Sequence, residues 1–91
     1  MPKLFRIGQY IIYFWSNENG EPLHVHITIG IPQANATKVW ITHTGACILA
    51  HNKSGIPQKD LNKLMDAISA QYFMIHAAWK MHFNAEPTYY C

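Results

Sequence analysis

The chain has few cysteines, little net charge and no long apolar run, and each shortage excludes a class of protein. Its 91 residues include only Cys47 and Cys91, too few for a disulfide framework or a four-thiolate zinc site, so we interpret both as free thiols. A formal charge of +2 is too small for the strong positive field of an obligate nucleic-acid binder. No segment approaches the roughly 20 apolar residues of a membrane span. We therefore expect a cytoplasmic protein with no membrane partner.

Apolar side chains, by contrast, are plentiful. Hydrophobic residues make up 49% of the chain and charged residues 13%, so the sequence is too apolar to remain disordered. A chain this short fits one domain with a small core. Part of its apolar surface is then left for a second copy or a small protein partner, and a homo-oligomer such as a dimer is the simplest expectation.

The order of hydrophobic patterns predicts an α+β fold, with an antiparallel four-stranded meander sheet packed on one long C-terminal helix. Runs rich in β-branched and aromatic residues, separated by turn residues, predict the strands. Pro57 suits the first helical position. The predicted strands are 5–15, 23–30, 37–42 and 46–51, the helix is 58–83, the single domain is 1–83, and 84–91 is expected to be a flexible tail.

The predicted helix is apolar over more of its circumference than one sheet can cover. Leu61, Ile68 and Trp79 belong to a stripe at spacings of three and four residues, which indicates the face packed on the sheet. After Tyr72, however, further apolar residues lie outside this stripe, namely Phe73, Met74, Ala77 and Met81. We expect the last turns of the helix to contact another molecule.

Two histidines stand out in the second predicted strand. Strict alternation there puts Val25 and Ile27 toward the core and His24 and His26 on the other face. Imidazoles two residues apart lie about 6.6 Å apart along the strand, so side chains that lean together can chelate a divalent metal. A zinc site would need a third ligand, for which the nearby candidates are Glu18, Glu21, His43 and His51. With no such ligand identified, the sequence predicts no obligatory cofactor.

The same pair is a candidate for acid–base catalysis. One neutral and one protonated imidazole can act as base and acid in metal-independent RNA cleavage, with Lys38 or Arg6 as the cation that contacts the phosphate. A small ribonuclease or a metal-dependent hydrolase with catalytic His24 and His26 is therefore one hypothesis. Whether the protein is an enzyme stays open at this point.

The outward face of the predicted sheet is also a candidate binding surface. Tyr13, Trp15, Lys38 and Trp40 share it with the two histidines by strand parity. Flat rings beside cations can stack nucleobases and pair with phosphates, so RNA or DNA is a possible ligand. Aromatic residues are equally enriched in dimer interfaces, and both interpretations stand.

Four segments resemble a family of small bacterial proteins, number 4160 in the domain-of-unknown-function series. They are residues 6–18, the motif Glu21-Pro22-Leu23-His24-Val25-His26, and residues 36–40 and 56–61. Members look like components of two-gene modules and are sometimes proposed as toxin–antitoxin partners. The resemblance implies a component that binds protein or nucleic acid, and it supplies no catalytic residue. Our leading hypothesis is therefore a toxin–antitoxin-like module component.

Overall fold

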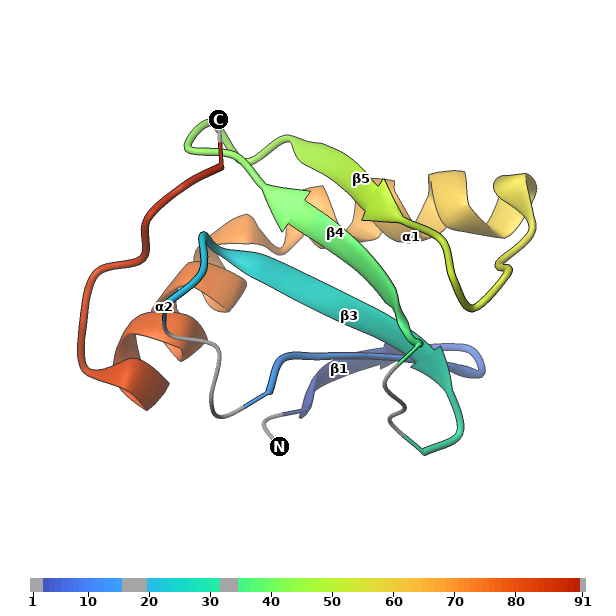
Figure 1. Cartoon of the computed structure of the whole chain (residues 1–91), viewed down its shortest axis with the longest axis horizontal. Coiled ribbons are helices and arrows are strands. Elements are labelled where there is room, and N and C mark those ends of the chain that lie inside the picture. Colours follow the sequence, from blue (N-terminus) through green and yellow to red (C-terminus); the bar gives the residue numbers. More distant parts are fainter. Residues whose placement is uncertain (1–2, 16–19, 32–34, 91) are drawn as a thin grey trace.

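Over the described part of the chain, the fold is a five-stranded antiparallel sheet with two helices (Figure 1). The computed structural model describes residues 3–15, 20–31 and 35–90. Each strand pairs with the next along the chain, so the predicted α+β class and antiparallel meander are confirmed for these residues. The elements are β1 (Lys3–Ile7), β2 (Tyr10–Tyr13), β3 (His24–Ile29), β4 (Thr37–Ile41), β5 (Cys47–His51), α1 (Gln58–Ala70) and α2 (Tyr72–Phe83).

The first predicted strand is two strands, so the predicted strand number of four is wrong. Ile7 pairs with Tyr10 across a two-residue turn at Gly8 and Gln9. Gly8 has φ of 56°, a backbone conformation that costs glycine little and favours a tight hairpin. β1 therefore folds back on β2 and forms one edge of the sheet.

The single long helix of the prediction is also wrong, because the chain leaves helical geometry at Gln71 (φ −99°, ψ 17°). At 1.5 Å per residue, an unbroken helix over 58–83 would be about 39 Å long. The longest dimension of the molecule is only 33 Å. The break lets α2 turn at one end of the sheet instead of projecting beyond it (Figure 1). Among the residues described, no helix has both the length and the apolar character needed to cross a membrane.

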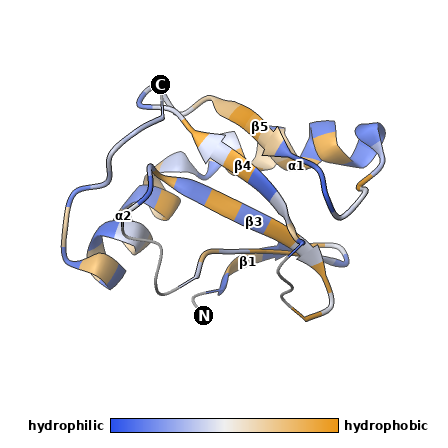
Figure 2. Ribbon diagram, in the orientation of Figure 1, coloured by the Kyte–Doolittle hydropathy of each residue, from blue (hydrophilic) through white to orange (hydrophobic). Residues whose placement is uncertain are grey.

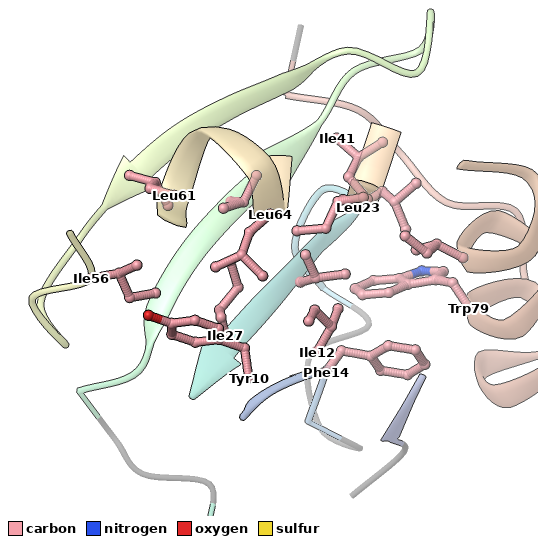
Figure 3. Packing of buried hydrophobic residues seen from close by; sticks show 14 residues of the cluster. Tyr10, Ile12, Phe14, Leu23, Ile27, Ile41, Ile56, Leu61, Leu64 and Trp79 are labelled. Carbon is pink, nitrogen blue, oxygen red and sulfur yellow. The ribbon is translucent and has the colours of Figure 1, made fainter. Parts of the chain in front are cut away.

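The main core lies between the sheet and the helices. Tyr10, Ile12 and Phe14 enter it from β2 and the residue after it, as their alternation predicts. Leu61 and Leu64 cover the sheet from α1, and Trp79 of α2 packs on Phe14 with ring centroids 5.0 Å apart (Figure 3). Alternating hydropathy along β3 is visible in Figure 2. Val25 and Ile27 of that strand are fully buried in the same core.

The segment after α2 lies against the domain as far as Tyr90. Thr88 accepts a 2.7 Å hydrogen bond on its carbonyl oxygen from the backbone N–H of Leu23. Lys80 contacts Glu86 at 2.6 Å, and the ring of Tyr90 stacks on Trp40 at 5.0 Å. These contacts hold the tail in place in the structure, while its predicted flexibility in solution stays a prediction.

Three of the sequence predictions fall outside the described residues. They are the last part of the family-like segment 6–18, the candidate metal ligand Glu18 and the free thiol of Cys91.

Candidate functional site

The side chains selected from the sequence as site residues lie together on the sheet face opposite α1. Strand register places Tyr13 beside His26, His26 beside Lys38, and His24 beside Trp40. The rings of His24 and His26 are 5.0 Å apart. Contacts of 5.3 to 5.5 Å join Tyr13 to Trp15, Tyr13 to His26, and His24 to Trp40. We call these residues the aromatic–histidine cluster: Tyr13, Trp15, His24, His26, Lys38 and Trp40.

This cluster is much less exposed than we expected of an outward sheet face. Tyr13 and His24 have no exposed surface, and His26 is 8% exposed. Tyr13 belongs to a second small core with Ile11 and Ala36, against which Trp15 packs. The sequence therefore predicts the face correctly and its exposure wrongly, because alternation shows which residues share a face and not what covers it.

His24 is held inside the fold by several contacts. Its Nδ1 lies 2.8 Å from the carbonyl oxygen of Pro22, and because a carbonyl only accepts, Nδ1 carries the proton and donates it. The indole of Trp79 packs 5.4 Å from the imidazole, and Trp40 lies on another side. A side chain so enclosed helps to join the start of β3 to α2 and is poorly placed to meet a substrate.

The candidate metal ligands do not converge. Among the described residues, no three histidine, cysteine or acidic side chains lie close enough together to hold a metal ion. Glu21 is committed elsewhere, since its carboxylate lies 2.5 Å from Nζ of Lys38. Chelation by His24 and His26 would thus need a rearrangement or a ligand from outside the described residues.

Lys38 lies at the border between the buried cluster and solvent. Its side chain is 16% exposed, and that of its partner Glu21 is 43% exposed. Nζ lies 4.3 Å from the centroid of the Trp40 ring, a cation–π contact that favours one position of the ammonium group. Tyr90 also stacks on the Trp40 indole, with an angle of 8° between the rings, so the ring face that Tyr90 covers is not open to a planar ligand.

The sequence indicates His51 only as a candidate metal ligand, but in the structure this residue extends the aromatic–histidine cluster to β5. It pairs with Lys38, whereas Val39, the next residue, pairs with Leu49. One additional residue, Ala50, therefore forms a bulge in β5, and bulges of this kind redirect a neighbouring side chain. Burial, and then the charges of Lys53, Lys38 and His26, lower the pKa of His51 below its usual value. Nothing in the sequence indicates this bulge.

Cys47 is a free thiol, as expected, and has the environment of a structural residue. Burial, assisted by the nearby charge of Asp66, raises the pKa of its thiol from 9.0 to about 11. The thiol is 3.4 Å from the carbonyl oxygen of Met65 and donates to it. A thiol that stays protonated near neutral pH is a weak nucleophile.

Fold and site together define a small α+β protein with a half-buried cluster of rings and cations on one sheet face and an exposed apolar helix face. A family model described as Domain of unknown function (DUF4160) matches residues 10–80, and the chain belongs to this family. The match includes the whole aromatic–histidine cluster and His51, and it ends before the tail. Neither the curated proteins nor the solved structures contain a significant match to the chain.

Proposed function

We propose that this protein is the interaction component of a toxin–antitoxin-like module and that it binds a protein partner through one face of α2. The observation that carries the proposal is the exposure of two large apolar side chains on that helix. Phe73 is 82% exposed and Met81 is 86% exposed. Ala77, also exposed, lies between them.

These residues form one continuous face. Positions 73, 77 and 81 are four residues apart, so they follow one side of a helix. Ile75 and Trp79 on the inner side of α2 are buried in the core. The helix therefore has apolar residues on two sides, of which the domain covers one. We call Phe73, Ala77 and Met81 the outer face of α2.

A partner with an apolar groove suits this face best. An amphipathic helix fills such a groove with apolar anchors about one turn apart on one face, as positions 73, 77 and 81 are. Full burial of a Phe or Met side chain contributes about 1.5–3 kcal/mol each. The neighbouring Lys80 pairs with Glu86 at 2.6 Å, which limits the positive charge beside the outer face. The chain resembles a family whose members look like components of two-gene modules. This resemblance supports a partner protein encoded by the second gene of such a module.

The test is co-expression with the product of the gene adjacent to its own. The tagged wild-type chain is expected to co-purify with that product, and the double variant Phe73→Glu/Met81→Glu to lose it. Both side chains are exposed, so the variant should retain stability within about 1 kcal/mol of wild type. Ile31→Glu is the matched control, since Ile31 is 76% exposed and follows β3 instead of belonging to α2.

Retention of the adjacent product by the double variant would contradict the proposal. A chain that purifies alone as a dimer through the same outer face would instead favour a second copy as the partner.

A further inference from the structure

Three side chains able to carry positive charge form a row across the outer sheet face. His26 of β3 lies opposite Lys38 of β4, and Lys38 lies opposite His51 of β5. Directly opposed residues of antiparallel strands have Cβ atoms about 5 Å apart on the same face. The row therefore brings three nitrogen donors from three adjacent strands to one place. The bulge at Ala50 is what supplies the third, because a regular β5 would put Ala50 opposite Lys38.

The three side chains of the row are largely buried but keep some exposed surface. His26 is 8% exposed and the Lys38 side chain 16%, while His51 is half-buried. Charge-assisted hydrogen bonds are stronger in such partly desolvated surroundings than in water. Lys38 has three N–H donors, of which Glu21 takes one, and two remain for another acceptor.

The environment of His51 supplies an independent indication of a ligand. Within the described residues, its Nδ1 is buried and has no hydrogen-bond partner, a condition that costs about 1–3 kcal/mol. The charges of Lys53 and Lys38 act on this imidazole and help to lower its pKa, after the effect of burial.

We propose that His26, Lys38 and His51 form a binding site for a phosphate group. Three nitrogen donors on adjacent strands can share the several acceptor oxygens of a phosphate, whereas a carboxylate offers only two oxygens. The group belongs either to inorganic phosphate or to a phosphodiester of a nucleic acid. This site is separate from the outer face of α2 and does not depend on the function proposed above.

Binding of a phosphodiester at this site strengthens as the pH falls, because the ligand keeps its charge while the protein gains protons. Glu21 offsets the charge of Lys38, so the added positive charge at the site comes from Lys53 and from protonation of His51. The lowered pKa of His51 means that the free protein holds this imidazole neutral near pH 7, and a bound anion favours its protonated form. His24 and Tyr13 pack beside His26.

The first test is titration of the wild-type protein with inorganic phosphate at pH 6, followed by the imidazole NMR signals of its six histidines. Saturable shifts are expected for His26 and His51 and none for His76, which lies on α2 beside Glu86. Unmoved His26 and His51 signals, or equal shifts of all histidines, would overturn the proposal. This result needs no variant and is not affected by a change in folding.

The second test replaces the central cation. Lys38→Met should weaken phosphate binding at least about tenfold, and Lys38→Arg, which keeps the charge, should retain it within about threefold. Lys59→Met, an exposed lysine of α1, is the control and should bind like wild type. Equal binding by Lys38→Met and wild type would overturn the site.

A thymidine tetranucleotide distinguishes the two sources of the phosphate. Its phosphodiesters stay ionised between pH 6 and pH 8, so tighter binding at pH 6 reports protonation of the protein. Binding at least about tenfold tighter than that of inorganic phosphate, and weakened by salt, would identify a nucleic acid as the ligand. Affinity no higher than that of inorganic phosphate would identify a free phosphate. If neither inorganic phosphate nor the tetranucleotide binds, the proposal is overturned.

Discussion

Truncation of His24 tests whether this histidine is a structural residue or a member of a catalytic pair. His24→Ala removes a fully buried ring together with its 2.8 Å hydrogen bond to Pro22. The lost hydrogen bond contributes about 1 kcal/mol. Truncation of a buried aromatic side chain to alanine costs about 3–5 kcal/mol with the cavity it leaves. That range applies to Phe and Trp, and imidazole is smaller than either ring, so we expect His24→Ala to lower the free energy of unfolding by about 3 kcal/mol in total.

The loss is large beside the whole stability of such a domain, about 5–15 kcal/mol. At about 4–8 °C per kcal/mol for a domain of this size, the thermal midpoint should fall by at least about 12 °C. Circular dichroism during heating and urea unfolding measure it. His43→Ala is the matched control, and because His43 is exposed its truncation should cost under about 1 kcal/mol. An unchanged midpoint for His24→Ala would refute the structural role and return the acid–base pair to consideration.

Two further predictions concern turn glycines and the buried thiol. Gly8→Ala should lower the free energy of unfolding by about 1–2 kcal/mol for its left-handed backbone alone. Gly45→Ala should lower it more, since the new Cβ would also lie 3.2 Å from the Tyr72 ring. Urea unfolding compares the two variants, and equal losses of stability would contradict the close contact between Gly45 and Tyr72. The Cys47 thiol ionises near pH 9 when unfolded but at about pH 11 in the fold, so the unfolded state binds fewer protons between these values and stability should decline as the pH rises through them. Cys47→Ala should lessen that decline, measured by unfolding at pH 8 and pH 10.5, and an identical decline in both proteins would contradict the raised pKa.

The sequence was a good guide to the strands whose alternation is strict. In β3 and β4 a two-residue period separates core residues such as Val25 and Val39 from His24 and Trp40, and the structure keeps that division. The first strand was misjudged because apolar residues continue on both sides of Gly8, so composition alone hid the turn. An isolated glycine within a strand pattern is a signal of irregular backbone, and it was present here.

The candidate site was predictable only as far as strand parity reaches. Parity brought the six cluster residues to one face, but their burial depends on α2, the tail and the second small core, all distant in sequence. The inclusion of His51 depends on one extra residue in β5. Register of this kind is set by turn geometry and packing, so no local pattern around His51 predicts it.

The most direct test of the central claim is the methyl NMR spectrum of the methionines while the adjacent gene product is added. Met81 belongs to the outer face of α2 and is 86% exposed, whereas Met65 of α1 is half-buried against the core. Our account predicts that the Met81 methyl signal shifts or broadens saturably and that the Met65 signal stays unchanged. Binding that leaves the Met81 signal unchanged would contradict the assignment of this face as the protein interface.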